Sequence, residues 1–338
     1  MHRTHVLSHL VAPALFLAVA LGALAPASTL AQQEPPAPTP ATPSVPTVIP
    51  TPTPRPAGTP PRVGLQVGHW KSNELPDELS RLRTSTGAYV RGLAEVDVNL
   101  DIARRVAALL TAQGIVVDLI PATVPPSYDA DAFVAIHADG SSSSRARGFK
   151  LATPWRTSRA SQHLLEALSA EYAAATRLPR DGGITVNMRG YYAFNYRRHT
   201  HAIARTTPAV ILETGFLTNP ADRALLTGQP DIVAAGIANG ILRYLRERDP
   251  SDGAALIPPE FGSYRAASPT VAVRAAPSDT ARVLLQATPE SRFFVFRERD
   301  GWFEVMVRGN RTVTGWVRVS DLVASNEPPP APPPSSDS

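Results

Sequence analysis

Three residues that can bind a metal or move a proton each follow a short apolar segment of the chain. They are His69, His137 and Glu213. Ligands gather at the carboxyl ends of the strands of an open parallel α/β sheet. Two histidines and a carboxylate at that edge, with a further acid nearby, predict a metallohydrolase site. The apolar segments that lead into them are residues 63–67, 132–136 and 208–212.

Each of these residues also has a simpler interpretation. His69 lies in a Gly-His-Trp turn and His137 in a His-Ala-Asp-Gly turn, where a lone histidine is more often a loop residue than a ligand. The pair, at the ends of two strands of one sheet, favours the ligand interpretation. Glu213 follows a buried strand without an intervening turn, and a carboxylate buried there must be paired, metal-bound or catalytic.

The further acid has two candidates, Glu95 and Glu74. Glu95 stands just ahead of a helix predicted to begin near Asp97, where a carboxylate also complements the helix dipole. Glu74 lies within a polar loop, residues 71–93. We favour Glu95, because a helix would hold it in place.

Composition excludes several kinds of site. The chain has 338 residues and no cysteine, so any metal must be held by His, Asp or Glu, and disulfides, cysteine nucleophiles and a lipid-modified cysteine are excluded. The sequence contains no HExxH helix motif, no GxSxG elbow and no phosphate-binding glycine loop. The net charge of +4 is spread without a basic run, which disfavours nucleic acid as a partner.

The N-terminal region is predicted to direct the chain out of the cytoplasm. Residues 1–31 have the pattern of a signal peptide, with an apolar stretch at 10–24 and a cleavage site before Gln32. If it stayed uncleaved, this segment would be the only membrane anchor. We expect a secreted or cell-envelope protein. Residues 32–61 are a predicted linker, since twelve prolines between 35 and 61 favour extended polyproline II.

Residues 62–248 alternate strand-like and helix-like segments, which predicts a doubly wound, mostly parallel α/β sheet. Helices are expected over 97–113, 158–176 and 231–246, each with apolar residues at helical spacing. The first of them ends before Gly114, a usual position for glycine after a helix. Its predicted buried stripe consists of Val98, Ile102, Val106, Leu109 and Gln113.

The last part of the chain is different. Short strand-like segments separated by turns predict a small all-β barrel over 262–325, joined by a linker at 249–261. Residues 326–338 are proline-rich and are predicted to be a disordered tail.

Four motifs in this order resemble the zinc-dependent N-acetylmuramoyl-L-alanine amidases of the AmiC/CwlV type (amidase_3 family), over about residues 62–248. They are His69, then Glu95 followed by Val98-Asn99-Leu100-Asp101-Ile102-Ala103, then Ala135-Ile136-His137-Ala138-Asp139, then Pro208-Ala209-Val210-Ile211-Leu212-Glu213-Thr214-Gly215-Phe216-Leu217-Thr218-Asn219.

The resemblance implies one Zn²⁺ on His69, Glu95 and His137, with Glu213 as the catalytic acid/base. It implies cleavage of the amide between the lactyl group of N-acetylmuramic acid and L-alanine in peptidoglycan. With three protein ligands, the fourth metal position is left for water, and Glu213 would pass the proton of that water to the departing nitrogen. We expect a monomer with peptidoglycan as its partner.

The sequence departs from the family pattern around the first ligand. The family usually has Asp-Pro-Gly-His-Gly-Gly there, whereas this chain has Gln66-Val67-Gly68-His69-Trp70-Lys71. Asp139 stands where asparagine is common, and the loop at 121–131 is shorter than usual. These differences bear on substrate preference. They also leave two alternative functions: a different zinc peptidase that acts on stem peptides, or a catalytically silent wall-binding protein.

Two further regions complete the prediction. The aromatic segment 190–198 is either packing under a loop or a cleft wall for a sugar–peptide ligand, with Tyr192, Asn195 and Arg197 as candidate substrate contacts. The C-terminal region resembles a bacterial SH3-like domain, a module thought to bind wall peptides. That likeness is carried by Val273-Arg274-Ala275-Ala276-Pro277, Gly301-Trp302-Phe303 and Gly315-Trp316-Val317.

Overall fold

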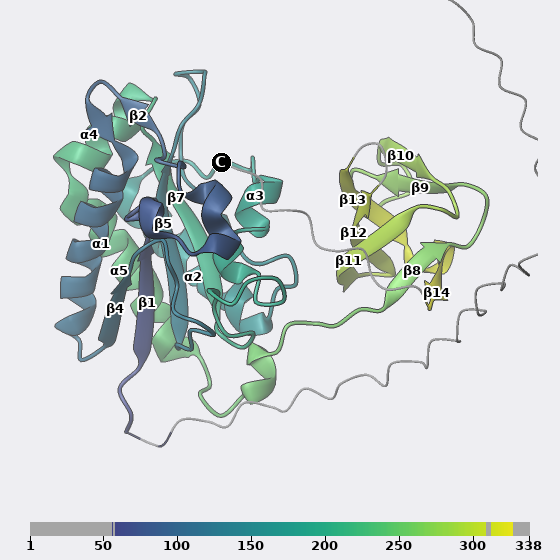
Figure 1. Ribbon diagram of the computed structural model, residues 1–338, viewed down its shortest axis with the longest axis horizontal. Coiled ribbons are helices and arrows are strands. Elements are labelled where there is room, and N and C mark those ends of the chain that lie inside the picture. Colours follow the sequence, from purple (N-terminus) through teal and green to yellow (C-terminus); the bar gives the residue numbers. More distant parts are fainter. Residues whose placement is uncertain (1–55, 57, 309–311, 327–338) are drawn as a thin grey trace, which may run out of the picture. The chain divides into compact units, whose positions relative to one another are not determined.

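The structure is a computed structural model that describes residue 56 and residues 58–308 and 312–326 (Figure 1). The predicted signal peptide, most of the proline-rich linker and nearly all of the C-terminal tail lie outside the described residues. Within the described part of the chain, no helix combines the length and the apolar character needed to cross a membrane.

The first folded region is built on a five-stranded sheet in the order β4-β1-β5-β7-β6. Four of the strands are parallel and the edge strand β6 is antiparallel to β7. This confirms the mostly parallel α/β sheet, although β6 was missed because it is only three residues long. The strands are β1 Arg62–Val67, β4 Val116–Ile120, β5 Ala132–Asp139, β6 Lys150–Ala152 and β7 Ala209–Phe216.

The two faces of this sheet are covered differently. The long helices α1 (Glu95–Thr111), α2 (Arg159–Thr176) and α5 (Pro230–Glu247) pack with one set of strand side chains into the larger core. The opposite set of strand side chains packs under short segments. These are η1 Ser72–Glu74, η2 Asp77–Leu82, α3 Val186–Arg189 and η3 Tyr192–Phe194.

Helix α1 differs from its prediction in two ways. It begins at Glu95, so this residue is the first of the helix and does not precede it. Its buried stripe continues to Leu110, whereas Leu109 is 42% exposed. At about 100° per residue, Leu110 lies nearer the centre of the buried arc than Leu109, which falls at its margin near the end of the helix.

The region predicted as a polar loop at 71–93 is ordered by short elements. After η1 and η2, the strands β2 (Tyr89–Val90) and β3 (Leu93–Ala94) form a small hairpin that leads into α1. The helix α4 (Pro220–Gly228), which packs into the larger core through Leu226, was also missed. It starts with Pro220 and is capped by Asn219, whose side chain accepts from the backbone N–H groups of Ala221 and Asp222.

The second folded region is an antiparallel sheet in the order β10-β9-β13-β12-β11-β8-β14, which curls into a half-barrel. Alternate side chains fill its own core, among them Val273, Phe293, Val305 and Val317. The all-β prediction is therefore confirmed. The strands are β8 Ser263–Ala266, β9 Val271–Arg274, β10 Val283–Ala287, β11 Arg292–Arg299, β12 Trp302–Arg308, β13 Val313–Arg318 and β14 Leu322–Ser325, with η5 Val319–Asp321 before β14.

The connection between the two regions is not a plain linker. It contains η4 (Gly253–Leu256), whose cap residue Asp252 accepts a hydrogen bond from Ala255 N–H. Asp252 also pairs with Arg159 at the start of α2. The folded part of the first region therefore extends past residue 249.

Candidate active site

His69 is placed by a left-handed turn at the carboxyl end of β1. Its φ is 64°, a conformation that is uncommon for a residue with a side chain and that is often found at functional sites. The preceding Gly68 lies against the ring of His137, since a Cβ built there would fall 2.5 Å from His137 Cε1. Glycine at 68 thus allows the turn after β1 to approach the end of β5.

Glu95 is held from several directions at the start of α1. Its Oε1 accepts from Ala138 N–H at 3.1 Å and from Asn99 Nδ2 at 3.1 Å, and its Oε2 accepts from Ala88 N–H at 2.8 Å. Asn99, one turn further along the helix, is fully buried and also donates to the carbonyl oxygen of Gly68. The carboxylate is therefore fixed before any ligand binds.

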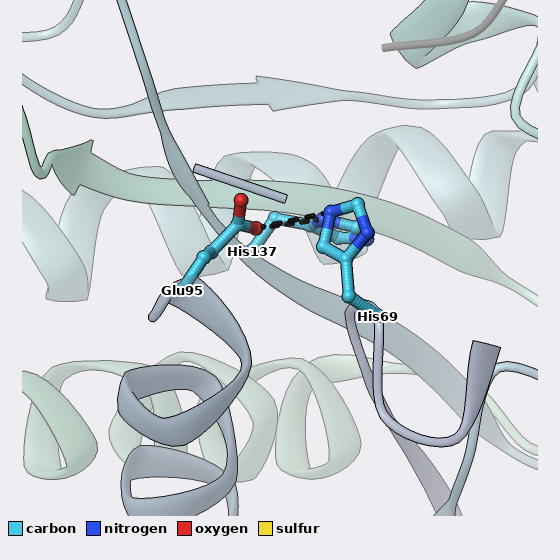
Figure 2. A group of neighbouring side chains, drawn as sticks. All are labelled: His69, Glu95 and His137. Carbon is cyan, nitrogen blue, oxygen red and sulfur yellow. Dashed lines mark hydrogen bonds and ion pairs between the residues drawn. The ribbon is translucent and has the colours of Figure 1, made fainter. Parts of the chain in front are cut away.

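The structure brings His69, Glu95 and His137 together, with ligand atoms within 4.8 Å of one another (Figure 2). Glu95 Oε1 is 3.4 Å from His69 Nε2 and 3.2 Å from His137 Nδ1. Two ligands of a tetrahedral zinc with bonds of about 2.0–2.1 Å lie about 3.3–3.4 Å apart. Two of the three ligand-atom distances are close to this value, and two imidazoles with one carboxylate are a donor set that suits a metal ion.

The protonation of the three groups reflects their mutual contact. Burial alone would raise the pKa of Glu95, but hydrogen bonds from His137 and His69 outweigh it and hold this pKa well below the usual value. Burial alone would lower the pKa of His69, but Glu95 outweighs it, so the pKa of His69 is raised. At the more deeply buried His137, burial prevails and the pKa is lowered.

Glu213 lies beside this cluster on β7, in register with His137 on β5. The neighbouring Thr214 donates its hydroxyl to the carbonyl oxygen of His137 at 2.8 Å, which ties the two strand ends together. Glu213 Oε2 is buried and has no hydrogen-bond partner among the described residues. Burial, followed by repulsion from Glu95 and Asp139, raises the pKa of Glu213 well above its usual value.

The cation Lys150 opposes this shift. It lies opposite Glu213 on the edge strand β6, and its charge lowers the pKa of that carboxyl. Its ammonium is bonded to Asp139, lies 3.7 Å from Asp181 Oδ2 and sits 4.7 Å from the centre of the Phe216 ring. Lys150 and Asp139 thus form a buried ion pair next to the candidate acid/base.

These groups face a cavity of about 620 Å³. Its polar side is formed by His69, Glu95, His137, Glu213, Asp139 and Lys150. Its apolar side is formed by residues in or next to η1, η2, α3 and η3, together with one residue after β4 and one on β7. The apolar lining residues are Leu75, Leu82, Ala122, Met188, Tyr191, Tyr192 and Ile211. The cavity therefore offers a proton-transfer site beside an apolar wall.

Of the three predicted substrate contacts, one lines the cavity and two do not. Tyr192 lines the cavity, although its hydroxyl is already bonded to the carbonyl oxygen of Ala122. Asn195 and Arg197 are not among the cavity-lining residues. The alternative acid Glu74 is exposed and paired with Lys71, away from the cluster.

The sequence interpretation did not single out three contributors to the site. Gly87 has φ 76°, and a Cβ there would fall 2.5 Å from Glu95 Oε2 and 2.7 Å from His69 Cδ2. Lys150 lies in a short edge strand, and Tyr191 stands next to Tyr192, the residue predicted to contact substrate. Only Tyr191 had a signal, since it belongs to the aromatic segment already noted.

The sequence of this chain is similar to that of a known amidase. N-acetylmuramoyl-L-alanine amidase LytC of Bacillus subtilis (strain 168) is 31% identical over 176 residues, which are 48% of this chain and 33% of that protein. The chain thus spans about a third of the length of this curated relative.

Solved structures of similar proteins also match. The catalytic domain of the amidase CwlV from Bacillus (Paenibacillus) polymyxa var. colistinus matches with a TM-score of 0.40 and 26% identity, over 56% of this chain and 99% of that one. The amidase AmiC2 of Nostoc punctiforme matches with a TM-score of 0.39 and 22% identity, over 55% of this chain and 97% of that one.

The decisive match is to a family. Residues 63–243 match Amidase_3, described as N-acetylmuramoyl-L-alanine amidase. This segment contains the five-stranded sheet from the second residue of β1 onward and all four residues of the candidate site. Because the match covers more than half of the 338 residues, the chain belongs to the N-acetylmuramoyl-L-alanine amidase family Amidase_3.

Proposed function

We propose that this protein is a zinc-dependent amidase that cleaves the bond between the lactyl group of N-acetylmuramic acid and L-alanine in peptidoglycan. The observation that carries the proposal is the buried cluster of His69, Glu95 and His137 beside Glu213, within a segment that matches the amidase family. A zinc ion held by the cluster would supply a Lewis acid that activates water and polarises the scissile carbonyl.

Glu213 is the residue we assign to proton transfer. Its buried Oε2 has no other hydrogen-bond partner among the described residues and is free to take a proton from the attacking water. The same carboxyl then gives that proton to the alanine nitrogen, because an amine leaves readily only when protonated. A raised pKa suits both steps, since an acid/base works best when its pKa is near the working pH.

Substrate contacts and targeting belong to the same proposal. Tyr192 would contact the substrate at the cavity wall, whereas Asn195 and Arg197, outside its lining, would contact a longer ligand. The half-barrel at 262–325 would act as an SH3-like module that binds wall peptides. Membership of a cell-wall amidase family supports action outside the cytoplasmic membrane, in line with the predicted signal peptide.

Two measurements test the proposal. The purified chain should bind one zinc ion, and His69→Ala and His137→Ala should each lose it, because each removes one of three protein ligands. Digestion of peptidoglycan should release N-terminal L-alanine and leave the glycan chains intact. New reducing sugar ends, or peptide fragments alone, would identify a different hydrolase, and stoichiometric zinc in both variants would refute the ligand assignment.

A further inference from the structure

The two histidines of the cluster are each held by both ring nitrogens. The inner nitrogens, His69 Nε2 and His137 Nδ1, face Glu95 Oε1. The outer nitrogen of His69, Nδ1, lies 3.0 Å from the carbonyl oxygen of Ser85. A carbonyl oxygen only accepts, so His69 carries its proton on Nδ1 and keeps Nε2 free for a metal.

His137 has the corresponding contact through a side chain. Its outer nitrogen, Nε2, lies 3.1 Å from the hydroxyl oxygen of Tyr191. If Nδ1 is the metal-facing atom, Nε2 must carry the proton and the tyrosine oxygen must accept it. The ring of Tyr191 stands edge-on to that of His137, with centroids 5.5 Å apart and planes at 88°.

The hydroxyl of Tyr191 is in turn held by a buried polar chain. Tyr192 donates to the carbonyl oxygen of Ala122, and Gln66 Nε2 donates to Tyr192 Oη at 2.8 Å and to the same carbonyl at 3.1 Å. Burial raises the pKa of Tyr192 to about 12, and hydrogen bonds from Tyr191 and Gln66 act in the opposite direction. The rings of Tyr191 and Tyr192 are also in contact, with centroids 4.6 Å apart. Because the Tyr192 hydroxyl already donates to Ala122, a Tyr191 hydroxyl that donates to Tyr192 keeps a lone pair for His137.

This series of hydrogen-bonded side chains gives a role to Gln66, which stands where the family usually has aspartate. Gln66 is fully buried on β1, and its amide supplies two N–H donors that a carboxylate could not supply. The Gln66 amide donates to the Tyr192 hydroxyl, and Tyr191 lies between Tyr192 and His137. The substitution thus fits a site whose second histidine is oriented by tyrosine.

We propose that Tyr191 is a positioning residue that fixes His137 with its proton on Nε2 and its Nδ1 toward the metal, and that Gln66 and Tyr192 hold Tyr191 for this task. The inference rests on the proposed zinc function. Outer partners of metal-bound histidines fix the tautomer and ring orientation, and their loss typically costs about 10–100-fold in metal affinity or activity.

The first test measures zinc affinity in the full chain by competition with a chelator. Tyr191→Phe removes one oxygen and should weaken zinc binding by about 10–100-fold. Tyr128→Phe is the control, because Tyr128 is a buried tyrosine that donates its hydroxyl to Asp118, and neither residue belongs to the cluster. Its zinc affinity should equal that of the wild type. Equal affinity in all three proteins overturns the proposal.

The second test needs no variant. Long-range proton–nitrogen NMR of the zinc-loaded wild type reports which ring nitrogen of each histidine carries the proton. We expect Nδ1–H at His69 and Nε2–H at His137. Nδ1–H at His137 would mean that Nε2 binds the metal, and Tyr191 could not then have the proposed role.

Gln66→Leu tests the hydrogen-bonding residue of this series that lies furthest from His137. It keeps the volume close to that of glutamine and removes both donors, so zinc affinity should fall, but by less than in Tyr191→Phe. An unchanged affinity removes Gln66 from the proposal. Failure of the wild type to bind zinc at all would refute the proposed function, whereas zinc binding that is indifferent to Tyr191→Phe refutes only this inference.

Discussion

At the scale of single residues, the proposed function assigns metal binding and proton transfer to two different carboxylates. Glu95 accepts two backbone N–H groups, and the hydrogen bonds and charges of His137 and His69 outweigh burial and hold its pKa low, which suits the proposed role as a carboxylate ligand. Glu213, with one oxygen buried and unpartnered among the described residues, has a raised pKa. Two carboxylates in different environments take different roles, as in other acid/base enzymes.

Glu213→Gln tests this division. The amide keeps the shape of the side chain but cannot accept and return a proton, so hydrolysis of peptidoglycan should fall by about 10²–10⁴-fold. Zinc content should remain at the wild-type value, because Glu213 is not one of the cluster ligands. A variant that digests peptidoglycan at close to the wild-type rate would remove Glu213 from the mechanism.

Lys150→Met tests how the pKa of Glu213 is set. Loss of the Lys150 charge removes an influence that lowers this pKa and breaks the ion pair of Asp139, so the pKa of Glu213 should rise further. A base with a higher pKa becomes protonated at higher pH, and the acid limb of the pH–rate profile should therefore move to higher pH. The double variant Lys150→Met/Asp139→Asn removes both charges and should move the limb back. An acid limb that does not move in Lys150→Met would contradict this assignment.

At the scale of elements, the site depends on close approach between the turn after β1, the hairpin before α1 and the end of β5. Gly68 allows the first turn to reach His137, and Gly87 allows the loop before β2 to reach Glu95 and His69. Both positions lack space for a Cβ. The cluster is therefore formed by backbone packing as much as by its side chains.

Gly87→Ala should disrupt the cluster without touching a ligand. A Cβ at 87 would fall 2.5 Å from Glu95 Oε2, so the carboxylate or the loop must move, and zinc affinity should drop. Gly92→Ala is the control, because Gly92 also has a positive φ, 84°, but no atom lies within 4 Å of its Cβ position. Both variants carry the cost of a side chain at positive φ. If zinc affinity falls equally in both, backbone strain and not the contact with Glu95 is the cause.

At the scale of the whole molecule, each of the two regions has a main core of its own. All described residues that line the cavity belong to the α/β region, and none of the described half-barrel residues is among them. In the half-barrel, Trp302 and Trp316 are buried, and arginine side chains lie over their rings. Any aromatic side chain of the half-barrel left exposed could contact wall peptide, and Phe294 is the one that is partly exposed among Phe294, Phe296, Trp302, Phe303 and Trp316.

Removal of the half-barrel should therefore weaken targeting and leave the chemistry intact. The chain should be cut after Pro258, because η4 and the Asp252–Arg159 pair belong to the α/β region. The truncated protein should turn over a small soluble muropeptide at the wild-type rate and pellet less with intact sacculi. If turnover of the small substrate is abolished while circular dichroism shows a folded domain, the module contributes to the active site and the targeting hypothesis is wrong.

The sequence by itself determined the α/β class, the long helices and the residues of the metal cluster. These features are encoded locally: apolar runs give buried strands, and helical spacing gives α1, α2 and α5. His69, His137 and Glu213 follow such strands directly, so the rule that ligands gather at strand ends was enough to bring them together. Glu95 was chosen over Glu74 for its helix, and the exposed position of Glu74 agrees with that choice.

Only the tertiary structure decided what surrounds those residues. β6 is three residues long and has no periodic signal, yet it places Lys150 opposite Glu213. Tyr191 and Tyr192 are adjacent and chemically alike, and only packing against His137 and Ala122 distinguishes their roles. Gln66 is an ordinary polar residue in a strand until its amide meets a tyrosine more than a hundred positions away. Local patterns set the ligands, whereas their supporting partners depend on contacts between segments distant in the chain.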